Sequence, residues 1–395
     1  MKRKLSMFLV IVLAAALVMA GCSTKAPEET KDPAESVSPE TAAPETDGEA
    51  AALPKIPNSH LESGEFAVGP NGETPVAADD ISLTDEQYAK IKEMKLTAAM
   101  LWAGSGEWYN AMTDGAKAEF EKMGIETVVQ SDAQFDPSKQ ATDVETAMAL
   151  TPDIILSLPV DPVSGTRAFK PAADAGVKIV FADNGVNDFK AGEQYVSICT
   201  GDQYGMGRAA AELLSDAIGG SGKIGIIYYD VDFLVTNNRD NEFVRTIQKD
   251  YPEIEIVSMM GFAEESATGD VAAAMFSQYP DLDGVYVSWD VAAEPVVAEL
   301  RANGMKDVKM VTYDLGGNND LDMAQKGNTY GKVADMPFQI GGTMAKLAAL
   351  SILGEEAPAY VVSGTVKMTV DNMVEAWNSA LNKNPDENVM KTLGK

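Results

Sequence analysis

The chain has 395 residues and a formal net charge of −29 at pH 7, because 60 Asp and Glu outnumber 31 Lys and Arg. Such an acidic surface repels phosphate backbones, so nucleic-acid binding is not expected. The only histidine, His60, lies in a polar N-terminal stretch, which excludes Ser-His-Asp or Cys-His catalysis and His-ligated zinc from the body of the chain. We therefore expect no catalytic residues, no metal site and no cofactor.

The N-terminus has the pattern of an export signal. A basic head, Lys2-Arg3-Lys4, precedes an apolar run over residues 7–20, which is shorter than the about 20 residues that a stable membrane span needs. The run ends in Leu17-Val18-Met19-Ala20-Gly21-Cys22, which resembles a bacterial lipoprotein signal. That resemblance implies that Cys22 is lipidated and becomes the new N-terminus; an ordinary secretory signal is the alternative.

Residues 22–83 read as an acidic tether rich in Pro, Ala, Glu and Thr, because they lack the hydrophobic periodicity that would bury apolar surface. Thr84 and Gln87 have the spacing of a capping box, which predicts a short lead-in helix over 84–95. Cys199 has no partner if Cys22 carries lipid, and its apolar neighbours predict a buried position.

From Lys95 onward, apolar strand-like runs alternate with longer amphipathic segments. The runs start about 24 to 31 residues apart, which leaves room for a crossover helix between parallel strands. The expected strands lie at 96–101, 125–129, 153–158 and 177–181, and then at 223–228, 254–258, 283–288 and 308–312. The expected helices lie at 112–123, 138–150, 166–175, 241–251 and 294–303. Continuously apolar strands are typical of parallel sheets covered on both faces, so we predict an α/β fold with two doubly wound lobes; one large sheet is the alternative.

In open parallel sheets, ligands bind beyond the carboxyl ends of the strands. Those ends carry aromatic, carboxylate and amide residues, and the candidate ligand contacts are Trp102, Ser105, Trp108, Tyr109, Asp183, Asn184, Asn237, Arg239, Phe262, Trp289, Asp290, Asp314 and Asp335. Aromatic rings can cover the C–H face of a sugar, while carboxylates and amides hydrogen-bond its hydroxyls. The pattern favours a polyhydroxylated ligand, although any single Asp or Asn after a strand is equally typical of a turn or a helix cap.

From about Lys95 to Trp377, the chain resembles the ribose- and galactose-type periplasmic sugar-binding proteins, the ligand receptors of bacterial ABC importers. The resemblance rests on the order and spacing of Trp108-Tyr109 before Asp114-Gly115-Ala116, residues 179–184, Tyr279-Pro280-Asp281-Leu282, Val311-Thr312-Tyr313-Asp314 and Ala334-Asp335-Met336-Pro337-Phe338-Gln339-Ile340-Gly341. It implies a type 1 periplasmic binding protein, in which three crossover segments join two lobes around the ligand. The implied domains are a signal at 1–21, the tether at 22–83, the lead-in helix at 84–95, lobe 1 at 96–200 plus 336–362, and lobe 2 at 201–335 plus 363–395.

The resemblance also assigns ligand contacts and shows where this chain departs from its family. The aromatic pair falls on Trp108 and Tyr109, and three polar positions fall on Asp183, Asp314 and Asp335. Ribose binders have Arg where this chain has Asn184. A second family Arg aligns with Asn237, while Arg239 matches a neighbouring position, and Trp289 or Asp290 replaces an Asn. The pocket is thus more acidic and aromatic than that of a ribose binder.

The expected function is that of a substrate-binding lipoprotein that captures a small sugar or polyol by hinge closure and delivers it to an ABC permease. We expect a monomer held by lipid on the outer face of the plasma membrane, with a Gram-positive type of cell favoured. Alternatives are a surface sensor that presents its ligand to a signalling receptor, or a binder of a nucleoside, an autoinducer-like furanose or a cationic solute. A glycosidase with two facing carboxylates would need similar residues, but the family resemblance opposes it.

Overall fold

The computed structural model describes residues 53–59, 64 and 66–395. The predicted signal, Cys22 and the tether up to residue 52 lie outside the described residues. Within the described part of the chain, no helix combines the length and apolarity that a membrane crossing needs.

The first sheet has seven parallel strands in the order β1-β12-β6-β5-β4-β2-β3. Its members are β1 (Val76–Ala77), β2 (Thr97–Trp102), β3 (Glu126–Asp132), β4 (Ile154–Ser157), β5 (Lys178–Ala182), β6 (Ser197–Gly201) and β12 (Tyr360–Ser363). We call this sheet and the helices that pack on it lobe 1.

The second sheet has six strands in the order β13-β11-β10-β9-β7-β8, all parallel except β13, which runs antiparallel to β11. Its members are β7 (Gly222–Tyr229), β8 (Ile254–Phe262), β9 (Gly284–Val287), β10 (Lys309–Tyr313), β11 (Thr329–Ala334) and β13 (Val366–Thr369). This sheet and its helices form lobe 2. The two doubly wound sheets that the sequence predicts are confirmed.

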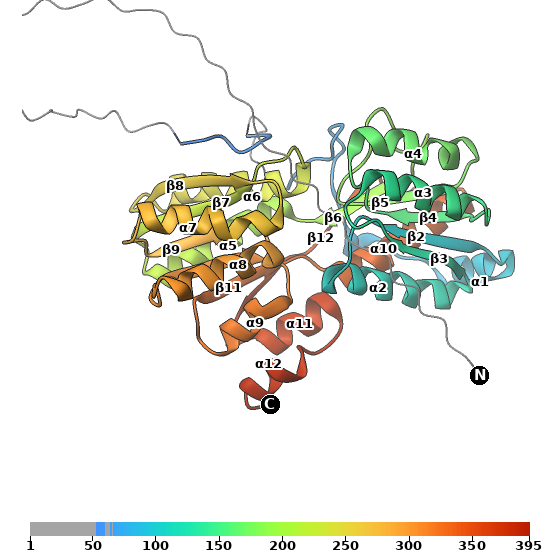
Figure 1. Ribbon diagram of the computed structural model, residues 1–395. Coiled ribbons are helices and arrows are strands. Elements are labelled where there is room, and N and C mark those ends of the chain that lie inside the picture. Colours follow the sequence, from blue (N-terminus) through green and yellow to red (C-terminus); the bar gives the residue numbers. More distant parts are fainter. Residues whose placement is uncertain (1–52, 60–63, 65) are drawn as a thin grey trace, which may run out of the picture. The chain divides into compact units, whose positions relative to one another are not determined.

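Helices cover the sheets in both lobes (Figure 1). They are α1 (Asp85–Met94), α2 (Glu107–Met123), α3 (Pro137–Met148), α4 (Pro162–Asp174), α5 (Gln203–Ile218), α6 (Leu234–Asp250), α7 (Thr268–Gln278), α8 (Asp290–Ala302), α9 (Gly317–Ala324), α10 (Pro337–Leu353), α11 (Met373–Leu381) and α12 (Glu387–Thr392), with short 3₁₀ turns at Ala78–Asp80 and Glu265–Ala267. The core alternates along each strand: Ala98 and Met100 of β2 pack with α2 and α10, whereas Ala99 and Leu101 pack on the opposite face. Both faces of the sheet are therefore buried, which explains the continuously apolar strands.

The chain passes between the sheets at three places: from β6 into α5, from β11 into α10 and from β12 into β13. The first two crossings lie in close contact at Gly201 and Asp335. A Cβ added at Gly201 would lie only 2.5 Å from the Asp335 Cβ, so no larger residue fits there without a shift. The three-crossover architecture expected from the resemblance is thus confirmed.

Several helices begin earlier than the apolar periodicity predicts. The helix expected from residue 112 begins at Glu107, and the one expected from residue 241 begins at Leu234. The first turn of α2 carries polar and aromatic side chains, and Leu234-Val235 at the start of α6 are followed by the polar run from Thr236 to Asp240, so periodicity detects only the later turns. Consequently Trp108, Tyr109 and Arg239 lie within helices and not in the loops before them.

The predicted tether extends too far toward the C-terminus. Ile56 is 3% exposed and packs in the core of lobe 2, and β1 pairs with β12 at the edge of the lobe 1 sheet. Isolated apolar residues such as Ile56 give no periodic signal, which is why composition alone placed them in the tether. The capping box of α1 is present as expected, with Thr84 and Gln87 bonding each other's backbone.

The crossing of α2 and α10 predicts one sharp stability effect. A Cβ at Gly341 would lie 1.9 Å from the Met112 carbonyl oxygen, so the two helices meet backbone to backbone. Gly341→Ala should lower the free energy of unfolding by about 3 kcal/mol, because the added methyl group forces the helices apart. Denaturant unfolding followed by circular dichroism measures this change in the free energy of unfolding.

Gly269→Ala is the matched control. Its Cβ would meet only the Pro295 Cβ at 3.4 Å, so we expect up to about 1 kcal/mol of stabilisation from helix propensity. Equal unfolding midpoints for the two variants would contradict the close crossing.

Candidate functional site

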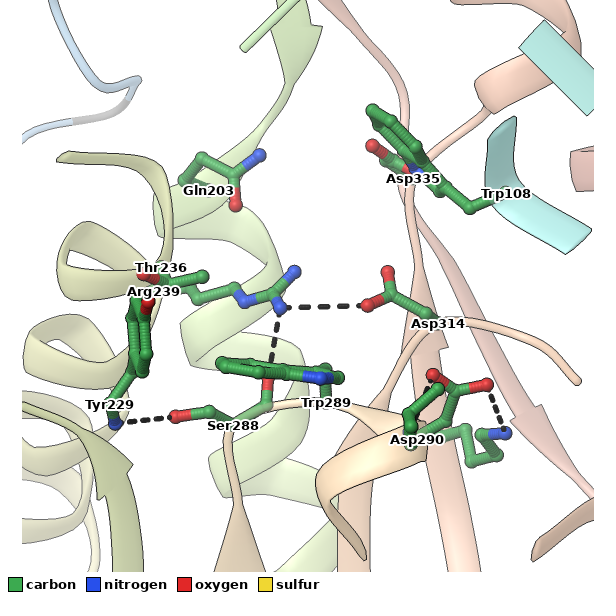
Figure 2. A network of polar contacts seen from close by, with 12 residues as sticks. Trp108, Gln203, Tyr229, Thr236, Arg239, Ser288, Trp289, Asp290, Asp314 and Asp335 are labelled. Atoms are coloured by element: carbon green, nitrogen blue, oxygen red, sulfur yellow. Dashed lines mark hydrogen bonds and ion pairs between the residues drawn. The ribbon is translucent and has the colours of Figure 1, made fainter. Parts of the chain in front are cut away.

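Side chains from both lobes and from the crossings meet at the carboxyl ends of the two sheets. The Trp108 indole Nε1, in the first turn of α2, donates to the Asp335 carboxylate in the second crossing at 2.9 Å. In lobe 2, Arg239 and Asp314 form an ion pair at 3.5 Å. Figure 2 shows Gln203, Arg239, Asp314 and Asp335 converging on the same space. Residues from distant parts of the sequence thus form one polar constellation.

Arg239 is held by contacts from three sides. A guanidinium nitrogen donates to the Ser288 carbonyl oxygen at 2.8 Å, and the group lies 4.4 Å from the centre of the Tyr313 ring. Its side chain is only 7% exposed, and its Nε has no hydrogen-bond partner. The carboxylate of Asp314 and a cation–π contact therefore stabilise a charge that would otherwise be costly to bury.

Asp240 fixes the strand ends beneath Arg239. This fully buried carboxylate accepts hydrogen bonds from the Tyr286 and Ser288 hydroxyls and from the Tyr229 backbone N–H. The bonds join the carboxyl ends of β7 and β9 to the first half of α6. Because the ends of β7 and β9 both bond the Asp240 carboxylate of α6, the Ser288 backbone carbonyl after β9 is held within reach of Arg239, which lies one residue earlier on α6.

Asp183 follows β5 in a left-handed backbone conformation with φ of 55°. Its carboxylate accepts a hydrogen bond from the Thr200 hydroxyl at 2.7 Å. Burial raises the pKa of Asp183 to about 6; the Thr200 hydrogen bond and the charge of Arg239 act in the opposite direction, while Asp314 adds to the rise. The pKa of Asp335 is raised well above its usual range by burial and by the charges of Asp183 and Asp314. A gathering of carboxylates from both lobes is therefore only partly balanced by Arg239.

Aromatic rings border the polar groups on the lobe 2 side. The Trp289 ring lies 5.0 Å from Tyr229 and 4.9 Å from Phe262, and its Nε1 donates to Glu265 at 2.6 Å. On the lobe 1 side, Trp108 and Tyr109 meet edge to face with ring centres 5.1 Å apart. Both lobes therefore present aromatic surface beside the carboxylates.

Among the buried polar atoms without a hydrogen-bond partner in the described part of the chain, three lie in Arg239, Gln203 and Asn184. They are the Arg239 Nε and the Gln203 side-chain oxygen of the constellation, and the side-chain nitrogen of Asn184, which follows Asp183 in the chain; the three residues are 6%, 1% and 6% exposed. A buried donor or acceptor without a partner costs roughly 1–3 kcal/mol, so such atoms are uncommon in native cores. Two donors and one acceptor of this kind after the strand ends mark a site that a polar ligand could complete.

Two of the predicted contacts are occupied by other roles. Trp102 is a core residue instead, because strand alternation places it beside Met100 under α2, where its indole donates to Thr113 at 2.8 Å. Asn237 is fully buried, and its amide bonds the backbone of Tyr229 and Phe233. Ser105 is exposed in the loop between β2 and α2, and its contact with a ligand stays a prediction.

Asp290 belongs to a second buried charge cluster next to the first. Its carboxylate lies 3.8 Å from the ammonium of Lys332, which is fully buried and bonds Asp320 at 2.7 Å. The Trp377 indole donates to the same Asp320 at 2.7 Å, and the residue is 1% exposed in a core cluster near the C-terminus. Burial raises the pKa of Asp290 to about 7, although the charge of Lys332 lowers it.

The sequence reasoning missed Gln203, Tyr229, Phe233 and Ser288. Phe233 crosses to pack against the core cluster of lobe 1 that includes Trp108 and Tyr109. Its position after the carboxyl end of β7 could have marked Phe233 as a candidate for the site, but an apolar residue at such a position is more typical of the hydrophobic core. Among the described residues, no three His, Cys, Asp or Glu side chains are placed to hold a metal ion.

The sequence model of a known family, the periplasmic binding protein domain, matches residues 98–356, which is more than half of the chain and includes strands of both sheets. This chain belongs to the periplasmic binding protein domain family. The match includes Trp108, Asp183, Arg239, Asp314 and Asp335, so the constellation lies within the family domain.

Curated relatives of the chain are named as sugar-binding proteins. The D-ribose/D-allose-binding protein of Pseudomonas aeruginosa is 25% identical over 72% of this chain and 90% of its own length. The ribose import binding protein of Bacillus subtilis is 22% identical over 66% of this chain and 82% of its own length.

Solved structures share the fold. An ABC transporter solute-binding protein from Agrobacterium vitis, bound to α-D-tagatopyranose, has a TM-score of 0.66 at 21% identity and covers 73% of this chain and 100% of its own. A solute-binding protein from Mycobacterium smegmatis with bound glycerol has a TM-score of 0.61 at 27% identity, covering 70% of this chain and 95% of its own. The fold is therefore that of ABC transporter solute-binding proteins.

The raised pKa of Asp183 predicts a stability effect whose sign depends on pH. Because the pKa is higher in the folded protein than in the unfolded chain, ionisation destabilises the fold as pH rises from about 4 to about 6, and the full penalty persists above pH 6. Asp183→Asn, which keeps the acceptor oxygen for Thr200, should raise the free energy of unfolding at pH 7.5 by about 1–3 kcal/mol. Denaturant unfolding at several pH values measures this gain, which should vanish below pH 4. The exposed Asp174→Asn serves as control; a gain from Asp183→Asn that stays constant with pH would contradict the assignment.

Proposed function

We propose that this protein is the substrate-binding lipoprotein of an ABC importer and captures a small sugar or polyol between its lobes. The observation that carries the proposal is the set of unpartnered buried atoms of Asn184, Gln203 and Arg239, two of which lie in the constellation that Trp108 and Trp289 border in Figure 2. Hydroxyl groups both donate and accept hydrogen bonds, so adjacent hydroxyls of one sugar can satisfy two donors and one acceptor at once.

The remaining groups suit the same ligand. Carboxylates such as Asp183 and Asp314 accept strong hydrogen bonds from hydroxyls, and the rings of Trp108 and Trp289 can cover apolar C–H faces. The names of the relatives, which include ribose, allose and tagatose, support a sugar, while the glycerol-bound structure supports a polyol. Because Asn184 stands where ribose binders have Arg, the proposal does not commit to ribose.

We propose hinge motion at the three crossings, near residues 200–202, 335–336 and 361–365. A Cβ added at Gly364 would meet no atom within 4 Å, so the backbone there has room to turn. Asp335 is both a proposed ligand contact and a hinge residue, which would let a bound sugar act directly on the angle between the lobes. Closure would give the permease a shape by which to distinguish loaded from empty receptor.

The export signal supports attachment through lipid on Cys22 to the outer face of the plasma membrane. A receptor tethered there stays near its permease at high effective concentration, provided that the tether reaches. One lipid chain anchors only weakly, so we expect more than one acyl chain on Cys22.

A thermal-shift screen of D-ribose, D-allose, D-arabinose, D-tagatose, myo-inositol and glycerol tests the ligand class. A sugar or polyol at 1,000 times its dissociation constant should stabilise the fold by about 4 kcal/mol and raise the melting temperature by several degrees. No shift with any of them, together with a shift from a nucleoside or an amino acid, would contradict the proposal.

Asn184→Ala should separate ligand binding from stability. The Asn184 side-chain nitrogen has no hydrogen-bond partner among the described residues, so its removal should leave the melting temperature of the ligand-free protein nearly unchanged. We expect affinity for the strongest sugar of the screen to fall at least about tenfold, or about 1.4 kcal/mol, as measured by calorimetry. Asn303→Ala, in an exposed position at the end of α8, is the control. Unchanged affinity in Asn184→Ala would remove this residue from the site.

A cationic solute is the second candidate, because the charge balance of the site favours it. Asp183, Asp314 and Asp335 face the guanidinium of Arg239, which leaves an excess of carboxylates. The matched pair D-galactose and D-galactosamine tests this. A cation binder should prefer the amine at least about tenfold and lose that preference below pH 6, where Asp183 becomes protonated. Equal affinities would favour the neutral sugar.

A further inference from the structure

Residues 53–59, which precede the family domain, pack on lobe 2. Ile56 is 3% exposed among the core side chains of that lobe, and Leu53 packs beside it. The Pro57 carbonyl accepts a hydrogen bond from the Asn241 side chain at 2.8 Å, and the Ser59 carbonyl accepts one from Arg245 at 3.3 Å. One apolar side chain and two backbone carbonyls thus fix this segment along α6.

Asn58 reaches from this segment to the loop between β7 and α6. Its backbone is left-handed, with φ of 59°, a conformation that Asn tolerates better than most residues. Its side-chain nitrogen donates to the Asp232 carboxylate at 2.8 Å and to the Asn237 side-chain oxygen at 3.1 Å. A single amide group therefore bonds both the loop and the helix that follows it.

Asn237, which accepts the bond from Asn58, also bonds both ends of the loop over residues 229–233. Its side-chain oxygen also accepts from the Phe233 backbone N–H at 2.9 Å, and its side-chain nitrogen donates to the Tyr229 carbonyl at 3.1 Å. Because Asn237 is fully buried, these bonds are shielded from competing water. The amide of Asn58 is thus the outer member of a network that encloses residues 229–233.

The enclosed loop carries two aromatic side chains of the constellation. Tyr229 lies against Trp289 and Phe262, with ring centres 5.0 and 5.5 Å away, and Phe233 packs against the core cluster of lobe 1. A small shift of the loop would therefore move aromatic surface in the site and the contact between the lobes.

We propose that Asn58 is a positioning residue of the ligand site, which holds the loop over residues 229–233 through Asn237 and Asp232. The proposal rests on the proposed function, since it assigns a role in that same site. The chain between Cys22 and the family domain then serves as more than a spacer, because its last residues help to shape the site.

Two variants of Asn58 test the role without disturbing its backbone. Asn58→Gly removes the side chain but keeps the left-handed conformation, and Asn58→Asp replaces the donor with a carboxylate that repels Asp232. Asn71→Gly is the control, because the Asn71 side chain bonds Glu73 and Tyr195 on lobe 1 and not the loop over residues 229–233. All are made in the full mature chain.

Hydrogen exchange of the ligand-free protein is the first measurement. We expect amides of residues 229–238, including the Phe233 N–H, to exchange at least about fivefold faster in both Asn58 variants, with α10 and the Asn71 control unchanged. Exchange at the wild-type rate would overturn the proposal. This readout needs no ligand, so it can overturn the proposal independently of whether the proposed function holds.

Calorimetry with the strongest sugar of the thermal-shift screen is the second measurement. Affinity should fall about fivefold to tenfold in Asn58→Asp and less in Asn58→Gly. Faster loop exchange with unchanged affinity would show a purely structural contact and overturn the positioning role, while leaving the sugar-binding proposal intact.

Discussion

A buried guanidinium, that of Arg239, balances the carboxylates that meet where the two lobes face each other. Its ion pair with Asp314, its hydrogen bond to the Ser288 carbonyl and its contact with the Tyr313 ring hold it in place. Without a cation there, burial of Asp183 and Asp335 beside the charge of Asp314 would favour protonation of the two buried carboxylates or separation of the lobes. The raised pKa values of Asp183 and Asp335 show that the balance is incomplete. The site thus has more carboxylate charge than Arg239 neutralises and polar atoms without a hydrogen-bond partner among the described residues, so a polar ligand that bonds these groups would stabilise it.

Much of the fold could be predicted from the sequence, because parallel strands are apolar on both faces and recur at crossover spacing. The starts of the helices could not, because candidates for ligand contact interrupt the apolar stripe: Trp108 lies in the first turn of α2 and Arg239 in the second turn of α6. Strand-end residues were found by position, but position does not say which way a side chain points. Trp102 therefore lies in the core, whereas Gln203 and Tyr229 lie in the constellation without having been predicted.

The N-terminal segment shows a second limit of sequence reasoning. Ile56 and Asn58 lie in a stretch whose composition is typical of a tether, yet one fills a core position of lobe 2 and the other bonds a loop of the site. Neither role has a periodic signature, since each depends on a single side chain meeting a distant helix. Residues 53–59 and the aromatic loop over residues 229–233 are thus connected through Asn58 and Asn237.

Small-angle scattering of the mature protein, with and without the sugar that stabilises it most, tests the central claim most directly. One ligand that completes hydrogen bonds from both lobes should draw the lobes together. We therefore predict a smaller radius of gyration when the sugar is present at saturation. A sugar that binds at saturation and leaves the scattering curve unchanged would contradict this mechanism.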